Sequence, residues 1–282
     1  SRTAGGDYGA TERWSFAQFG NRILAADGVD AMQSYVLGSS TDFAALGGSS
    51  PIARYLATVR GFVVAASVAA ALRRVQWCAL EDPTDWVTSA TTLADQQDLP
   101  DGGTITGIVG GEFGTIFQQR AVKRMTFVGP PTIFQFDELL RDIGCMAPGS
   151  IAVHANDCYF LSDDGFHVLR GMTQLEHISD TVCSDYFFAD FDANYPDRVT
   201  ATVDPATQFY MVAYPGAGNS AGTPNKGLIY NPRINRWSRF EQALEILFPA
   251  VQAASSYTLD TLDSVNTSID ALAASLDSSL WT

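Results

Sequence analysis

The stretch SIAVHANDCYFLSDDGFHVLR, residues 150–170, contains three short apolar segments that are separated by two polar turns. The apolar segments are Ile151 to His154, Cys158 to Leu161 and Phe166 to Arg170. The turns between them carry Asn156-Asp157 and Asp164-Gly165, residue types that favour tight reversals of the chain. The stretch therefore predicts three consecutive antiparallel β-strands.

The same rhythm of short strands and turns recurs along most of the chain. Units begin near residues 16, 55, 105, 151 and 199. Their spacing of about 40–50 residues is the blade period of a β-propeller, in which each blade has four antiparallel strands. We predict an all-β fold, a β-propeller-like array of short antiparallel blades, with a pair of β-sandwiches as the alternative.

Three parts of the chain depart from this rhythm. The segments 138–143 and 176–188 are expected to include short helical turns, and residues 255–282 are expected to form a weak helix or an extended connector. In that last segment Leu259, Leu262, Val265, Ile269, Leu272 and Leu276 recur at intervals of three and four. The predicted organisation is an N-terminal extension (1–13), a complete or incomplete propeller (14–248) and an acidic C-terminal connector (249–282).

The composition argues against tight binding of nucleic acid. The 31 acidic residues outnumber the 17 lysines and arginines, which gives a net charge of −14. Affinity for nucleic acid comes mainly from neutralised phosphates, so such a chain is expected to repel DNA and to let it slide past.

The longest apolar stretch, residues 62–72, is far shorter than the ~20 residues that span a bilayer, and we expect a soluble protein. The sequence opens on Ser1 without an initiator Met, so we expect a processed product or a piece of a longer chain.

The residues that most often carry chemistry show no catalytic pattern. Cys78, Cys145, Cys158 and Cys183 lack CxxC spacing and are expected to be buried free thiols in a reducing compartment, although sequence alone does not exclude disulfides. His154, His167 and His177 are separated by 13 and 10 residues, unlike the ligands of standard metal sites, and are expected to be structural or surface histidines. We therefore predict no catalytic residues, no metal ligands, no cofactor and no enzymatic activity.

Two acidic motifs and one glycine-rich run resemble known binding loops only in part. Asp190, Asp192 and Asn194 have the alternation that opens a calcium loop, but Tyr195 stands where such a loop needs glycine. The run 162–165, SDDG, lacks the spacing and the tryptophan of a sialidase-type Asp-box and is expected to be a β-turn. The glycine-rich run 110–114, GGEFG, lies between predicted strands and is expected to be a tight turn rather than a phosphate cradle.

Several strings, taken in order, resemble the tail hub or nozzle proteins of podophages, which are known as tail tubular protein B or packaged-DNA stabilisation protein. The likeness covers most of residues 14–240, and no single motif in it is diagnostic. The strings are FGNRI (19–23), DGVD (27–30), GSSTDFAALGG (38–48), RVQWCALEDPTDW (74–86), GGEFGTIF (110–117) and FLSDDGF (160–166).

The resemblance implies a structural virion protein that forms a six-fold ring in the phage tail. In that family the ring continues the DNA channel below the portal and adaptor, retains packaged DNA and guides its ejection. The implied partners are further copies of the chain, the adaptor or portal-proximal tail proteins, and tail fibre or needle proteins, with assembly in the host cytoplasm. Members of the family are usually much longer than 282 residues.

A ring of identical subunits needs a patch that fits a different patch on the next copy. The candidate interface residues are Arg54, Arg60, Arg73, Arg74 and Arg233, which would pair with carboxylates of a neighbouring subunit. The candidate acidic channel or loop residues are Asp185, Asp190, Asp192 and Asp197. The alternative functions are a carbohydrate-binding or glycoside-processing β-propeller and a generic protein-interaction propeller.

Overall fold

The computed structural model describes residue 8 and residues 13–179 and 181–249 of the chain. The chain divides into two units, Ser1–Leu247 and Phe248–Thr282, and the first of these is described here. The helix or connector predicted over residues 255–282, and nearly all of the connector predicted over 249–282, fall outside the described residues.

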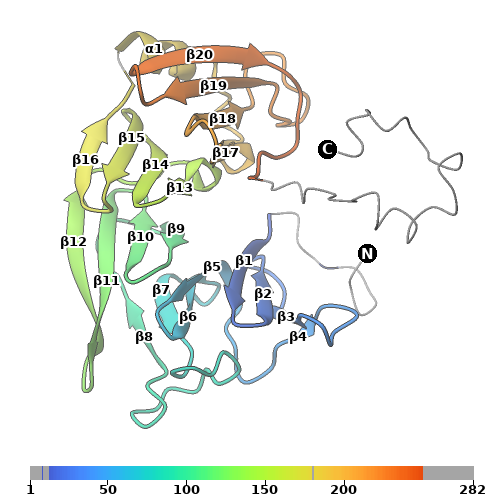
Figure 1. Ribbon diagram of the computed structural model, residues 1–282, viewed down its shortest axis with the longest axis vertical. Coiled ribbons are helices and arrows are strands. Elements are labelled where there is room, and N and C mark those ends of the chain that lie inside the picture. Colours follow the sequence, from blue (N-terminus) through green and yellow to red (C-terminus); the bar gives the residue numbers. More distant parts are fainter. Residues whose placement is uncertain (1–7, 9–12, 180, 250–282) are drawn as a thin grey trace, which may run out of the picture. The chain divides into compact units, whose positions relative to one another are not determined.

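The described residues form five four-stranded antiparallel sheets, and each sheet is a meander of four strands that are consecutive in the chain (Figure 1). The first sheet contains β1 (Ser15–Phe19), β2 (Arg22–Ala26), β3 (Gln33–Val36) and β4 (Ala44–Ala45). The second contains β5 (Ala53–Val59), β6 (Phe62–Val68), β7 (Ala71–Trp77) and β8 (Asp95–Asp98). The third contains β9 (Ile105–Val109), β10 (Gly114–Gln118), β11 (Ala121–Gly129) and β12 (Ile133–Arg141).

The last two sheets are separated by the α-helix of the described residues. The fourth sheet contains β13 (Ala152–His154), β14 (Asp157–Ser162), β15 (Gly165–Arg170) and β16 (Gln174–His177). The helix α1 (Thr181–Asp190) follows, and the fifth sheet contains β17 (Thr200–Val203), β18 (Tyr210–Tyr214), β19 (Lys226–Asn231) and β20 (Arg236–Glu241). Two 3₁₀ turns, η1 (Pro148–Ser150) and η2 (Pro196–Arg198), precede β13 and β17. The helix is too short to cross a bilayer, so the described residues contain no helix that could span a membrane.

The hydrophobic core lies between consecutive sheets. One cluster joins the first three sheets through side chains such as Leu24, Phe62 and Phe134. A smaller cluster, which includes Phe117 and Phe160, joins the third sheet to the fourth, and another joins the fourth sheet and α1 to the fifth. Each sheet is therefore held by its neighbours, because a four-stranded meander alone buries too little apolar surface to be stable.

Burial falls from the middle strands of a sheet toward its last strand. All seven residues of β6 are buried, so this strand is covered on both faces by apolar packing. β8, with the sequence DQQD, is mostly exposed, and β4 is fully exposed. The polar residues of β8 and the two-residue length of β4 discourage pairing of these edge strands with other chains.

Two arginines connect the fifth sheet to the first two sheets. The guanidinium of Arg13, just before β1, donates to the carbonyl oxygens of Val199 and Arg198, each at 2.8 Å. Arg54 in β5 forms an ion pair of 3.0 Å with Asp197 in η2. Contacts also join the first strands of neighbouring sheets, namely β1 with β5, β5 with β9, and β13 with β17. Residues almost 190 positions apart in the chain are thus held side by side by hydrogen bonds.

The all-β class is confirmed, and the first strands begin at Ser15, Ala53, Ile105, Ala152 and Thr200, close to the predicted starts. Five separate sheets do not fit a pair of two-sheet sandwiches. The helical turn expected within 138–143 is wrong, because residues 133–141 pair with β11 as the strand β12. The helical turn expected within 176–188 is confirmed in α1, although residues 174–177 form β16.

Candidate functional site

Three side chains that could act as metal ligands meet in the fourth sheet, near the β14–β15 turn and the end of β16. Asp164 lies in the two-residue turn between β14 and β15, where Ser162 pairs with Gly165. His167 in β15 lies directly opposite His177, the last residue of β16, in the antiparallel register. Directly opposite residues point to the same face of a sheet, so the two imidazoles are forced together.

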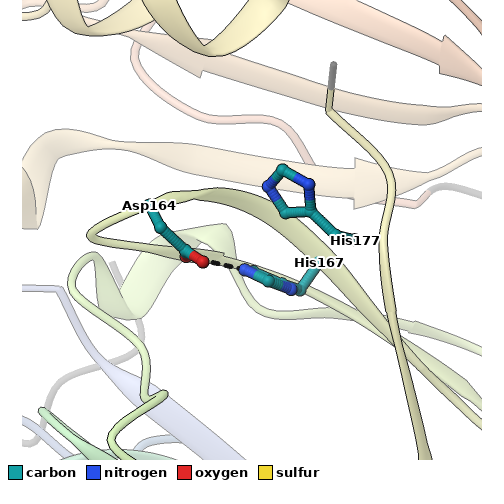
Figure 2. A group of neighbouring side chains, drawn as sticks. All are labelled: Asp164, His167 and His177. Atoms are coloured by element: carbon teal, nitrogen blue, oxygen red, sulfur yellow. Dashed lines mark hydrogen bonds and ion pairs between the residues drawn. The ribbon is translucent and has the colours of Figure 1, made fainter. Parts of the chain in front are cut away.

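Figure 2 shows the three side chains converging on one small region. Nε2 of His167 lies 2.7 Å from Oδ1 of Asp164, and the two imidazole rings have centroids 4.7 Å apart. One potential ligand atom from each of the three residues lies within 4.8 Å of the other two. We call Asp164, His167 and His177 the His–Asp cluster.

The members of the His–Asp cluster differ in burial. The side chain of His167 is only 2% exposed and stacks on Phe160, whereas that of Asp164 is 54% exposed. Burial lowers the pKa of His167, although the hydrogen bond and charge of Asp164 act against this. Partial burial alone would raise the pKa of Asp164, but the hydrogen bond from His167 and the charges of the two imidazoles together lower it. At neutral pH the cluster therefore holds a neutral imidazole beside a carboxylate.

The hydroxyl of Ser179 lies beside His177 and pairs with a second serine. Oγ of Ser179 is 3.3 Å from Nε2 of His177 and 2.8 Å from Oγ of Ser184, and it accepts a hydrogen bond from the backbone N–H of Phe166. Ser179 is only 2% exposed, so its hydroxyl organises the loop before α1 rather than facing a substrate. A Cβ on Gly165 would come within 2.4 Å of Oγ of Ser179, so only glycine fits beneath these groups.

An open groove of about 790 Å³ adjoins the cluster between α1 and the β19–β20 hairpin. Its lining includes His177, Val182, Tyr186, Ile234, Arg236 and Arg239. Val182 and Ile234 are 77% and 64% exposed, and the guanidinium of Arg239 lies over the ring of Tyr186. The groove thus combines an apolar rim with two cationic side chains on a strongly acidic chain.

Four of the five predicted interface arginines have partners within the chain. Arg54 pairs with Asp197, and Arg60 pairs with Glu112. Arg74 makes two hydrogen bonds to Asp98, at 2.6 and 3.0 Å, and Arg73 donates to the carbonyl oxygen of Pro100. These contacts join loops and strands of one subunit, and pairing with a neighbouring copy stays a prediction.

The fifth arginine, Arg233, is exposed in the turn between β19 and β20. It lies next to Ile234, which lines the groove. Of the five predicted interface arginines, Arg233 is therefore the one placed beside the groove.

The predicted acidic residues do not form a single group. Asp185 is exposed on α1, whereas Asp190 at the end of α1 is an ion-pair partner of Lys226 at 2.7 Å. Asp192 accepts hydrogen bonds from Asn219 and Asn194, and these lower its pKa. The carboxylate of Asp190, which would be the first ligand of a calcium loop, is instead paired with Lys226.

The four cysteines, all within the described residues, are buried and form no disulfide, as the sequence indicates. Burial raises the pKa of Cys78 to about 12 and that of Cys145 to about 11, so both thiols stay protonated at neutral pH. A thiol of this kind is unreactive, because the thiolate is the nucleophile.

Sequence reasoning missed the pairing of His167 with His177. The signal for it was present in the Gly171-Met172-Thr173 reversal, because a hairpin centred on Met172 places positions 167 and 177 opposite each other. Separation along the chain suggested isolated histidines, whereas strand register made them neighbours.

Comparisons with known proteins give no family. No family model matches this chain, and no curated protein matches it. A solved structure of the computationally designed Ika8 protein is similar with a TM-score of 0.49 and 9% identity, over 86% of this chain and 66% of the designed one. The extracellular domain of the hybrid two component system BT4673 from B. thetaiotaomicron is similar with a TM-score of 0.39 and 10% identity, over 60% of this chain and 22% of that one.

Proposed function

We propose that this chain is a structural subunit of the tail hub or nozzle of a short-tailed bacteriophage. In this proposal its five sheets are consecutive blades of a β-propeller, and six copies form a ring that continues the DNA channel. The ring retains packaged DNA and guides its ejection. The motif strings that resemble podophage tail proteins and the five regularly spaced meander sheets support this assignment.

The observation that carries the proposal is the continuous packing of sheet against sheet. Apolar clusters join each sheet to the next, and Arg13 and Arg54 connect the fifth sheet to the first two. Such an array resists deformation, because bending it would open well-packed apolar contacts between sheets. A channel wall that withstands the pressure of a packaged genome needs this stiffness.

The charge of the chain suits a channel that DNA passes through without binding. Six copies at −14 carry about −84, and acidic walls repel the phosphate backbone. DNA then moves along the channel without the phosphate contacts that dominate binding affinity.

The groove between α1 and the β19–β20 hairpin is the surface that we assign to contact with the next copy. Ring closure needs two different complementary patches on each subunit. Arg236 and Arg239 offer positive charge to a neighbour whose net charge is −14, and Val182 and Ile234 offer apolar surface at the rim. The other proposed partners are the adaptor or portal-proximal proteins and the tail fibre or needle proteins of the virion.

Mass photometry and negative-stain imaging of the purified chain test this proposal. We expect six-fold rings, with Ile234→Asp shifting the population to monomers because a charge would be buried in the interface. Val128→Asp is the matched control, since Val128 on β11 is 49% exposed and lies outside the groove, and it should leave the rings intact. A wild-type chain that stays monomeric at every concentration, and that is absent from the tail axis of virions, would rule the function out.

A further inference from the structure

We infer that Asp164, His167 and His177 form a binding site for one zinc ion at the outer end of the fourth sheet. The inference goes beyond the proposed tail function. It rests on the geometry of the His–Asp cluster rather than on any resemblance.

The donor set matches the chemistry of zinc. Zinc in proteins is bound by imidazole nitrogens and carboxylate oxygens at about 2.0–2.2 Å, in tetrahedral geometry, so its ligand atoms lie about 3.3 Å from one another. In the His–Asp cluster the three potential ligand atoms lie within 4.8 Å of one another, and the closest pair is 2.7 Å apart. Tetrahedral spacing lies between these two values.

The backbone holds the cluster in place before any ion binds. His167 and His177 are paired in register on neighbouring strands, and Asp164 is fixed in the two-residue turn that begins β15. His167 is also packed against Phe160, so its ring has little freedom. A site on paired strands loses little conformational entropy on binding, and this favours affinity.

An ion in the cluster would take the place of one hydrogen bond. Nε2 of His167 now donates to Oδ1 of Asp164 at 2.7 Å, so binding at this nitrogen would move the imidazole proton to Nδ1. The contact between Nε2 of His177 and Oγ of Ser179 is 3.3 Å long, at the weak end of hydrogen bonds, and Ser179 keeps its bonds to Ser184 and Phe166 if His177 turns away.

Access to the cluster is open on one side. The carboxylate of Asp164 is half exposed, and the exposed His177 lines the groove beside α1. Three protein ligands leave one zinc position for water. A bound ion would tie the β14–β15 turn to the end of β16, where the chain continues into α1.

Titration calorimetry and thermal denaturation of the EDTA-treated full chain with zinc chloride test the inference. We expect one zinc ion per chain, and at a zinc concentration of about 100 times Kd a rise in Tm of about 5–10 °C. Cobalt(II) should give the intense visible bands of a tetrahedral site, and magnesium and calcium should not compete, because they prefer oxygen ligands.

Variants assign the binding to the cluster. His177→Ala and Asp164→Asn change exposed side chains, so both should fold, and each should weaken zinc binding at least about tenfold. His154→Ala, on β13 and outside the cluster, is the matched control and should bind zinc as the wild type does. No stoichiometric zinc binding, or equal affinity in His177→Ala and the wild type, would overturn the inference.

Ring assembly gives an independent readout. Rings that form equally well in EDTA, from a chain that binds no zinc, would overturn the zinc site and leave the tail function standing. Zinc binding by a chain that never forms rings would support the zinc site and overturn the tail function.

Discussion

Gly165 shows how a single residue sets the geometry of the His–Asp cluster. Its φ of +138° lies in a region that favours glycine, and it begins β15 directly after Asp164. An added Cβ would stand 2.4 Å from Oγ of Ser179 and 2.8 Å from Nε2 of His177. The missing side chain therefore allows Asp164, His177 and the serine pair to gather around one point.

We expect Gly165→Ala to lower the free energy of unfolding by about 2–4 kcal/mol, because backbone strain and a steric clash add together. Chemical denaturation with urea measures this loss. Gly218→Ala is the matched control, since Gly218 also has a positive φ of +82° but a Cβ there would meet no atom within 4 Å. Equal losses in the two variants would mean that backbone strain alone decides the effect and that the crowding at Gly165 is unimportant.

At the scale of elements, the apolar strands of each sheet could be predicted and the polar last strands could not. β14 and β15 lie within one residue of the predicted segments 158–161 and 166–170, because apolar runs bounded by turn residues identify strands that are buried. β8 reads DQQD and β16 reads QLEH, and neither has the apolar alternation that would reveal a strand. Such segments become strands because a neighbouring strand offers unpaired backbone groups, a tertiary effect that local sequence does not carry.

The same limit explains the errors at β12 and at the His–Asp cluster. Residues 138–141 look helical in isolation, but their pairing with β11 and the ion pair of Lys123 with Glu138 at 3.8 Å hold them extended. His177 falls on β16, one of the edge strands that were missed, so its position opposite His167 was hidden as well. The turn at Asp163-Asp164 was predicted correctly, whereas the strand β16, which carries His177, was not predicted.

The link between the first and fifth sheets depends mainly on Arg13. Its guanidinium donates to three carbonyl oxygens, those of Val199, Arg198 and Glu245. Burial is the main cause that lowers the pKa of Arg13, and the nearby charge of Arg198 adds to it. A partly buried guanidinium with several acceptors contributes more than an exposed one, because its loss leaves carbonyl groups unsatisfied.

We expect Arg13→Ala to lower the free energy of unfolding by about 1–3 kcal/mol and to speed amide hydrogen exchange in β1 and β17. Hydrogen-exchange mass spectrometry resolves the two strands. Arg73→Ala serves as control, because Arg73 makes one exposed hydrogen bond, to Pro100, and its loss should cost less than about 1 kcal/mol. Unchanged exchange in β17 of the Arg13 variant would show that the two sheets are not coupled through this side chain.

The whole molecule depends on a narrow apolar connection between its two halves. A large cluster unites the first three sheets, and another unites the fourth and fifth sheets with α1. Between them lies the small cluster that contains Phe117 of β10 and Phe160 of β14, whose rings have centroids 5.2 Å apart. Cooperative unfolding of all five sheets therefore requires this small cluster, because it is the apolar bridge from the third sheet to the fourth.

We expect the wild-type chain to unfold in a single calorimetric transition and Phe117→Ala to destabilise it by about 3–5 kcal/mol. In a double-mutant cycle Phe117 and Phe160 should show a coupling energy of about 0.5–1.5 kcal/mol, as aromatic pairs in contact do. The double variant should unfold in two transitions, one for sheets one to three and one for sheets four and five, because each half keeps its own core.

Phe16→Ala is the control, since Phe16 on β1 is 60% exposed and should change stability by less than about 1 kcal/mol. A double variant that still unfolds in one step would mean that the polar links made by Arg13 and Arg54 are enough to unite the five sheets, and that the apolar bridge is dispensable.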